Sequence, residues 1–179
     1  MADEIWTIGH SNRELQVFLD LLQEFQIETV ADVRSFPSSR KWPHFNRDSL
    51  RDSLKDIGCG YVHLPGLGGR RHHRAESSRN TAWQVESFNA YADHMEEESF
   101  RVDLDRLQAV ARDSRSSLMC AEAVPWRCHR RLIADALIVR GWKVHDILGH
   151  RQARLHQLPP FARVADGQVY YPGGQLFPE

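Results

Sequence analysis

The apolar residues of the first third of the chain alternate between short β-rich runs and a stretch with helical spacing. Residues 5–8 form one apolar run, and residues 29–33 form a second about one helix length later. Between them, apolar positions over residues 15–25 recur every three to four residues. This stretch follows a Ser-x-x-Glu capping box formed by Ser11 and Glu14. This pattern predicts a strand, a helix and a second strand, joined as a parallel pair by a right-handed crossover.

The same alternation continues to about residue 150. It predicts strands over residues 61–64, 117–121 and 143–148, and helices over residues 46–57, 88–95, 104–110 and 125–140. Pro125 fits a first helical turn, Gly141 ends that helix, and residues 66–83 lack periodicity and are expected to form a long loop. We therefore expect an α/β fold, a single-domain three-layer sandwich with a mainly parallel sheet of about five strands and helices on both faces.

The last residues carry the signal of a small hairpin. Asp166 and Gly167 stand between two β-like flanks, and Asp-Gly favours a tight turn between antiparallel strands. With 179 residues the chain is long enough for one full core. We expect residues 1–150 to form the α/β domain, and residues 151–179 to form a C-terminal tail whose hairpin packs on the same domain.

Composition narrows the class of protein. Apolar residues make up 41% and charged residues 26%, with a formal net charge of -1, which excludes a globally basic nucleic-acid coat and an acidic disordered chain. No apolar run approaches the roughly 18 residues of a membrane span, and the N-terminus lacks the regions of a signal peptide. Three cysteines are too few for a disulfide framework. We expect a cytoplasmic protein with reduced thiols and no membrane contact.

The polar residues that could take part in catalysis or ligand binding follow the predicted strands. They are His10 and Ser11 after the first strand, Asp32 and Arg34 after the second, His63 at the third, and Cys120, Glu122, Cys128, His129 and Arg130 after the fourth. In a parallel sheet the carboxyl ends of the strands share one edge, where ligands bind near the point at which the strand order reverses. Such a switch point between the first and fourth strands would bring His10 close to Cys120.

The segment 120–131 carries the strongest chemical signal. A helix starting at Pro125 would point free amide groups and a positive dipole end at this edge, and nearby arginines would add charge, so an anionic ligand fits. The same field would favour the thiolate of Cys120 or Cys128, with His129 or His10 as proton partner. Glu122 is a candidate general base. The alternative is that Cys120, at the end of a buried strand, is a small core side chain.

A metal centre is an alternative use of the same side chains. Cysteine and histidine ligate zinc and iron, and the candidate ligands are Cys120, Cys128 and His10, with His63 and His129 as further ligand types. The seven residues between the two cysteines do not match a zinc-finger spacing. The sequence requires no cofactor, and zinc or iron stays open as the alternative.

Charge is unevenly distributed along the chain. Residues 34–74 hold nine Lys or Arg against three Asp, interleaved with Trp42, His44 and Phe45. Cations mixed with stackable rings suit phosphates and exposed bases, although a solvated loop has the same composition. Within this segment, backbone amides at Gly68 and Gly69 could cradle a phosphate, but the sequence matches no P-loop.

These residues together resemble a known family. Five short runs are similar to motifs of the bacterial and archaeal family called domain of unknown function 488. They are Thr7–Ser11, Asp32–Arg34, His63–Pro65, Cys120–Glu122 and Cys128–Arg130. The segment Leu158–Ala162 also resembles the C-terminal segment of that family. The resemblance spans nearly the whole chain. Pro159 stands where the family pattern suggests threonine, which removes a hydroxyl at that position. The resemblance implies the fold and the pocket and leaves the reaction open.

The sequence thus gives one leading hypothesis and two alternatives. The leading one is an enzyme for an anionic substrate, phosphate-bearing, nucleotide or nucleic acid. Its expected catalytic residues are Cys120, Glu122, Cys128, His129 and His10, and its expected anion-binding residues are Ser11, Arg34, His63, Gly68, Gly69 and Arg130. The alternatives are a non-catalytic nucleic-acid-binding module that uses residues 34–74, and a metal-binding protein. Oligomeric state stays open.

Overall fold

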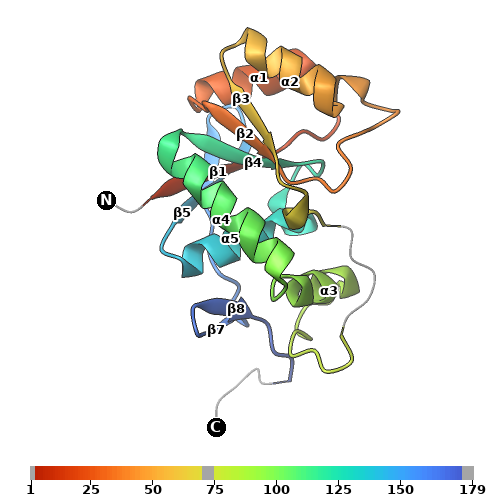
Figure 1. Ribbon diagram of the computed structural model, residues 1–179, viewed down its shortest axis with the longest axis vertical. Helices are drawn as coiled ribbons and strands as arrows, with labels where there is room; N and C mark the ends of the chain where they lie inside the picture. Colours follow the sequence, from red (N-terminus) through yellow and green to blue (C-terminus); the bar gives the residue numbers. More distant parts are fainter. Residues whose placement is uncertain (1–2, 70–74, 175–179) are drawn as a thin grey trace.

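A computed structural model describes residues 3–69 and 75–174 of the chain (Figure 1). Its centre is a six-stranded sheet with the order β3-β2-β4-β1-β5-β6, in which β6 alone runs antiparallel to its neighbour. The strands are β1 (Glu4–Gly9), β2 (Thr29–Asp32), β3 (Gly60–His63), β4 (Ser116–Cys120), β5 (Lys143–Gly149) and β6 (Gln152–Leu155).

Helices cover both faces of the sheet. One face carries α1 (Leu15–Glu24) and α2 (Arg47–Asp56); the other carries α3 (Glu86–His94), α4 (Glu98–Asp113) and α5 (Arg130–Val139). In Figure 1 the first pair lies at the upper end and the other three lie below it. This is the predicted three-layer α/β architecture, because each central strand must bury side chains on both sides.

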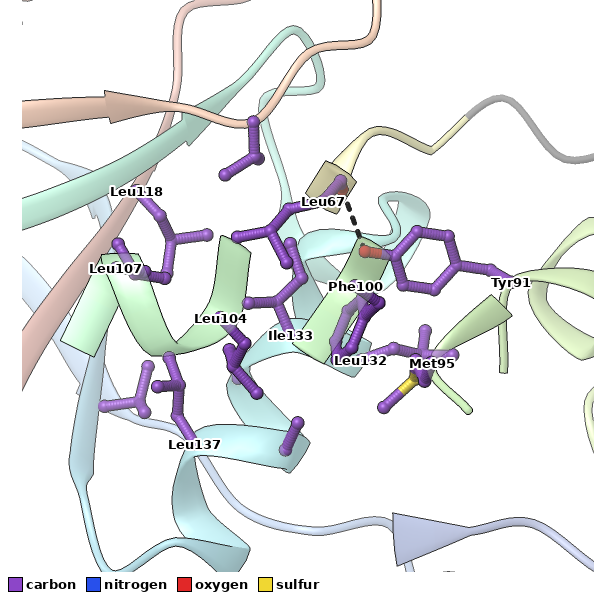
Figure 2. Packing of buried hydrophobic residues seen from close by; sticks show 14 of the residues in the cluster. Leu67, Tyr91, Met95, Phe100, Leu104, Leu107, Leu118, Leu132, Ile133 and Leu137 are labelled. Carbon is purple, nitrogen blue, oxygen red and sulfur yellow. Dashed lines mark hydrogen bonds between the residues drawn. The ribbon is translucent and has the colours of Figure 1, made fainter. Parts of the chain in front are cut away.

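Alternation along the strands divides the core into two clusters. Val30 and Met119 pack toward α1 and α2, whereas Ala31 and Leu118 pack toward the opposite helices. Figure 2 shows the larger cluster, where α4 and α5 meet. In it the Tyr91 hydroxyl donates a hydrogen bond to the Leu67 carbonyl oxygen at 2.8 Å, which ties α3 to the turn that leads to the candidate site.

The sheet has six strands, whereas about five were expected. The additional strand, β6, pairs antiparallel with β5 at the sheet edge, and all of its side chains are exposed. An exposed edge strand buries no apolar face, so it has no hydrophobic alternation that the sequence could show.

Two helix starts differ from the sequence predictions. Glu14 stands at the N-cap position of α1 without a side-chain hydrogen bond to the helix, and Ser11 adopts a left-handed backbone conformation with φ of 51°, so the expected Ser11–Glu14 capping box does not form. After β4, Pro125–Arg127 forms a short 3₁₀ turn, Cys128 is extended, and α5 begins only at Arg130. The positive end of α5 therefore does not start at Pro125, because the extended Cys128 interrupts the helix.

The strand order, which the sequence could not give, places a switch point between β1 and β4. Strands β1 and β4 are parallel neighbours, and their connections diverge to α1 on one face and α5 on the other. Backbone pairing continues past the strand ends, since His10 N–H donates to the Cys120 carbonyl at 3.0 Å and Ser11 N–H to the Ala121 carbonyl at 2.9 Å. Diverging connections at the carboxyl ends leave room for a ligand there.

The predicted hairpin is also present, as β7 (Arg163–Ala165) and β8 (Gln168–Tyr170). Asp166 and Gly167 both have positive φ, as a type I′ turn requires. Of the expected loop over 66–83, residues 65–67 form a 3₁₀ turn, and residues 70–74 lie outside the described residues. In the described part of the chain, no helix has the length and apolarity to cross a membrane.

Candidate active site

A cleft of about 760 Å³ opens at the carboxyl edge of the sheet, beside the ends of β1, β2 and β4. Eight of the residues that the sequence predicted for the site line it: His10, Ser11, Arg34, Gly69, Cys120, Glu122, Cys128 and His129. They come from four separate segments of the chain. The parallel sheet brings these segments to one edge, as the strand-end argument requires.

Two cysteines form the floor of the cleft. The Sγ atoms of Cys120 and Cys128 lie 2.6 Å apart, and the residues are only 1% and 3% exposed. Cys120 ends β4, and the 3₁₀ turn Pro125–Arg127 carries the chain back so that Cys128 faces it. The Cys128 amide donates to the Pro125 carbonyl at 3.0 Å and closes this turn.

A fully buried arginine lies directly beneath the pair. Arg130 Nη1 donates to Cys120 Sγ at 2.8 Å and also to the Glu122 carbonyl oxygen. The other guanidinium nitrogens donate to the Ala123 carbonyl at 3.0 Å and to Thr7 Oγ1 at 3.3 Å. The sequence predicted Arg130 as a ligand for a substrate anion, but here it lies below the cleft floor and engages the thiol.

The two thiols differ in acidity. Burial alone would raise the pKa of Cys120, but a hydrogen bond from Cys128 and the charge of Arg130 outweigh it, so this pKa lies below its usual range. The pKa of Cys128 lies well above its usual range because of burial and the neighbouring Cys120. Of the two thiols, Cys120 is therefore the one that loses its proton more readily, and Cys128 is the one that holds its proton more firmly.

Close packing around the pair depends on glycines. A Cβ on Gly9 would overlap the Glu122 carbonyl oxygen and come within 2.8 Å of Arg130 Nη1. A Cβ on Gly69 would overlap the ring of His129. Gly68, predicted to cradle a phosphate together with Gly69, instead packs against Ser35, and a Cβ on Gly68 would overlap the Ser35 side chain. These glycines allow the neighbouring backbone and side chains to approach the cleft.

His10 and Arg34 form a second polar group on the cleft wall. His10 Nδ1 lies 2.9 Å from the Ser11 carbonyl oxygen, so Nδ1 carries the proton and donates. Nε2 then accepts from Arg34 Nη1 at 3.2 Å. Burial lowers the pKa of His10 to about 4, against the effect of its hydrogen bond to Ser11. His10 is thus a neutral imidazole whose lone pair is already used, which fits a positioning role better than proton transfer.

The charge of Arg34 is balanced within the protein. Its Nε and Nη2 donate to the two oxygens of the buried Asp32 at 2.9 and 2.7 Å. The Tyr61 hydroxyl donates to the same carboxylate at 2.7 Å. His63 Nε2 donates to the Arg34 carbonyl at 2.8 Å and does not line the cleft. Arg34 therefore shapes the wall of the cleft, and His63 supports it from the neighbouring strand.

Glu122 and His129 line the cleft together with the two cysteines. The Glu122 side chain is exposed and lines the cleft, while its carbonyl oxygen faces Arg130. His129 is half-buried, its Nδ1 lies 3.5 Å from Cys128 Sγ, and its ring packs 5.1 Å from the ring of Tyr91. The loop after β4 and the start of α5 thus bring a carboxylate and an imidazole to the thiol pair.

A buried polar network behind the site was missed at the sequence level. His156 lies between Asp146 (2.9 Å) and Asp135 (2.8 Å), and these hydrogen bonds outweigh burial and raise its pKa to about 9. Tyr171 donates to Asp135 at 2.8 Å, and Thr7 donates to Asp146 at 2.8 Å. Because Thr7 also accepts from Arg130, the network reaches the cleft floor. Isolated acidic residues within apolar segments were the only signal for it.

A metal site requires that several ligand side chains lie close together, and the structure shows where the proposed ligands lie. Within residues 3–69 and 75–174, no three His, Cys, Asp or Glu side chains lie close enough together to hold a metal ion. Of the proposed ligands Cys120, Cys128 and His10, the two cysteines meet, but both ring nitrogens of His10 are engaged in hydrogen bonds elsewhere.

The fold and cleft define an α/β protein with paired cysteines and a buried arginine at the carboxyl edge of a parallel sheet. The chain belongs to the family described as domain of unknown function DUF488, whose model matches residues 14–137. This range contains the Cys120–Arg130 segment, and β1 with His10 and the C-terminal hairpin lie outside it. A search of curated proteins and a search of solved structures found no match to the chain.

Proposed function

We propose that this protein is an enzyme in which the Cys120 thiolate attacks an anionic substrate bound in the cleft. The observation that carries the proposal is the contact of 2.8 Å between Cys120 Sγ and Nη1 of the fully buried Arg130. The other groups that Arg130 hydrogen-bonds are two carbonyls and a hydroxyl, all neutral. A buried guanidinium needs a counter-charge. The Asp146 carboxylate, which Thr7 links to Arg130, supplies part of it without direct contact, and a Cys120 thiolate supplies the negative charge that Arg130 contacts.

The rim of the cleft fits an anionic ligand that carries a ring. Exposed Lys41 and Arg127 line it, and Ser11, Ser38 and Ser39 add hydroxyl donors. Lys41 and Arg127 replace Arg34 and Arg130 as the proposed anion-binding cations, because the charges of the latter two are balanced by Asp32 and Cys120. Glu122, on the same rim, is the proposed base for an incoming water or acceptor group.

The rim also bears aromatic surface. Phe36 is 68% exposed and Trp42 is half-buried, and both line the cleft. A base or other planar group stacks favourably on such rings, so a nucleotide is the proposed type of substrate. We also place the protein in a reducing compartment such as the cytoplasm, since the thiolate mechanism needs both cysteines reduced.

The test is the rate of alkylation of each cysteine by iodoacetamide between pH 5 and 10, followed by mass spectrometry of the native full-length chain. We expect Cys120 to react with an apparent pKa below the ~8.5 of a free thiol, and a nucleoside monophosphate to slow the reaction. Cys59 is the internal control, because it is buried at the other end of the sheet and burial raises its pKa to about 11.

The C120S variant should lose the fast phase, and C59S should keep it. The proposal fails if Cys120 in the folded protein reacts more slowly than free cysteine over the whole pH range. If Cys120 reacts fast but no anion protects it, the thiolate part stands and the anionic substrate is wrong.

A second candidate function is non-catalytic nucleic-acid binding by residues 34–74. The observation in its favour is that Lys41 and Trp42, near the start of this segment, line the cleft beside the exposed Phe36. Binding of a labelled single-stranded oligonucleotide should then weaken steeply with salt, by release of counterions from the phosphates. It should also weaken in K41A/W42A and be unchanged in C120S. Absence of binding at low salt would exclude this candidate.

A further inference from the structure

Cys128 is a buried nucleophilic side chain that the proposed reaction does not need. A lone Cys120 thiolate would be sufficient for attack on a substrate. A second thiol in contact with it could itself attack most covalent intermediates, in competition with water or the acceptor group. Yet the chain brings Cys128 back across a 3₁₀ turn until its sulfur lies 2.6 Å from that of Cys120. Its position at the cleft floor calls for a function of its own.

We propose that Cys120 and Cys128 together form a thiol–disulfide exchange site whose substrate is an anionic low-molecular-weight disulfide. This inference rests on the proposed function for the Cys120 nucleophile and the cationic rim of the cleft. It replaces the nucleotide by an anionic disulfide as the substrate, which is attacked at sulfur. Attack at sulfur leaves a mixed disulfide on Cys120, and a neighbouring thiol resolves such an adduct by bonding to the Cys120 sulfur itself.

The geometry supports both halves of such a reaction. The two sulfurs already face each other within the cleft floor, so an internal disulfide can form without a large movement of the backbone. Arg130 contacts Cys120 through its guanidinium and Cys128 through its backbone N–H at 3.5 Å, so it holds both partners in place. His129 Nδ1 lies 3.5 Å from Cys128 Sγ and is the proposed acceptor of the Cys128 proton.

The reaction has two steps. The Cys120 thiolate attacks one sulfur of the substrate R–S–S–R, a Cys120–S–S–R bond forms, and R–S⁻ leaves and takes a proton from water. Cys128 then gives its proton to His129, and its thiolate attacks Cys120 Sγ and expels the second R–S⁻. Two electrons pass from the cysteine pair to the substrate, and a small dithiol reductant returns the protein disulfide to two thiols.

The different acidities of the two thiols suit this order. Exchange is fastest when the attacking thiol has a pKa near the ambient pH, which favours Cys120 as the attacking group. Cys128 stays protonated while Cys120 is charged, because the neighbouring thiolate raises the Cys128 pKa. Formation of the mixed disulfide removes that charge and so favours deprotonation of Cys128 for the second step.

The experiment treats the reduced, full-length protein with glutathione disulfide without oxygen, and follows released thiol and intact protein mass. We expect two thiols released per chain and a product lighter by the two thiol hydrogens, with peptide mapping showing a Cys120–Cys128 disulfide. C128S should stop at a stable glutathione adduct on Cys120 with one thiol released, and C120S should react at least about tenfold more slowly. C59S, the matched control, should behave like the native protein.

The products of the native protein alone distinguish the outcomes, so the test does not depend on the folding of any variant. A native chain that stops at a glutathione adduct on Cys120, with one thiol released, overturns the exchange proposal and leaves Cys120 as the nucleophile of the proposed function. No reaction at Cys120 overturns both. The neutral disulfide of 2-mercaptoethanol should react more slowly than the anionic one after correction for its rate with free cysteine; equal corrected rates would overturn the anionic preference.

Discussion

Arg130 is the residue on which the chemistry of the site depends. Its guanidinium is fully buried, contacts the Cys120 sulfur, and satisfies two backbone carbonyls of the loop that follows β4. One side chain therefore both stabilises the thiolate and fixes the loop that carries Glu122. These two roles can be separated by substitution.

Replacement of Arg130 by methionine removes the charge and keeps much of the volume. The pKa of Cys120 should then rise, because burial acts without opposition from the cation. A rise of one unit from about 7 lowers the thiolate fraction at pH 7 from about one half to about one tenth, so alkylation of Cys120 at pH 7 should slow by at least about fivefold. R130K keeps the positive charge and should fall between R130M and the native protein. Native-like alkylation of a folded R130M would show that Arg130 does not set the acidity of Cys120.

Gly9 is a second residue whose identity the structure explains. A Cβ at this position would overlap the Glu122 carbonyl and push it away from Arg130. We expect G9A to destabilise the fold by about 2–3 kcal/mol and to raise the apparent pKa of Cys120. G149A is the matched control, because its Cβ would meet only Gln152 Oε1 at 3.6 Å, an ordinary contact. Urea unfolding of both variants gives the comparison, and equal stabilities would contradict it.

At the scale of elements, a buried charge network joins β5, the segment after β6 and α5. His156 bridges Asp146 of β5 and Asp135 of α5, and its pKa is raised to about 9 from 6.5. The unfolded chain therefore binds fewer protons than the folded chain between these pH values. The stability that His156 contributes is fully present below about pH 6.5 and is lost as the pH rises to about 9.

We expect this contribution to be on the order of 3 kcal/mol between pH 6.5 and 9. The Cys120 thiol titrates in the same pH range, and its contribution to stability changes with pH in the opposite direction. The comparison is therefore made between two proteins that both contain Cys120. Urea unfolding of the native chain and of H156Q, at pH 6.5 and at pH 9, isolates the His156 contribution as the difference in their pH dependence. Identical pH dependence in the two proteins would show that His156 is not held as the cation.

The elements differ in how well the sequence predicts them. The five parallel strands carry enough apolar residues to be found, and the hairpin was found from Asp166 and Gly167, because positive φ favours these residue types. Strand β6 was missed, since its exposed side chains show no pattern. The helix start expected at Pro125 was wrong because Cys128 leaves helical geometry to face Cys120, which lies eight residues earlier at the end of β4.

At the scale of the whole molecule, the C-terminal tail completes the core. Val169 and Tyr171 are buried in the same cluster as α3, α4 and α5, and the Tyr171 ring lies 5.1 Å from that of Trp83. The tail and the three helices therefore bury one continuous apolar surface. We expect the α/β domain and its tail to unfold as one cooperative unit.

Substitution within the tail tests this expectation. Y171A removes a fully buried ring and its hydrogen bond to Asp135, and should cost about 3–5 kcal/mol. Y170A, the matched control, removes a half-buried ring stacked under Arg79, and should cost about 1 kcal/mol or less. Circular dichroism during thermal unfolding should show a single transition for both. Two separate transitions, or equal losses, would show that the tail is not part of the core.

The sequence by itself determined the α/β class, the family, and the edge of the sheet at which the chemistry gathers, because apolar periodicity and the polarity of parallel strands are local properties. Only the tertiary structure decided what each residue does there. It turned Arg34 and Arg130 inward to Asp32 and Cys120, occupied both nitrogens of His10, and paired Cys120 with Cys128. Most of these partners are near in the chain, since Arg34 pairs with Asp32 two residues away and Cys120 with Cys128 eight residues away. Even so, the roles depend on burial and on which nearby group each side chain finally contacts, and the pattern of apolar and polar residues does not specify either.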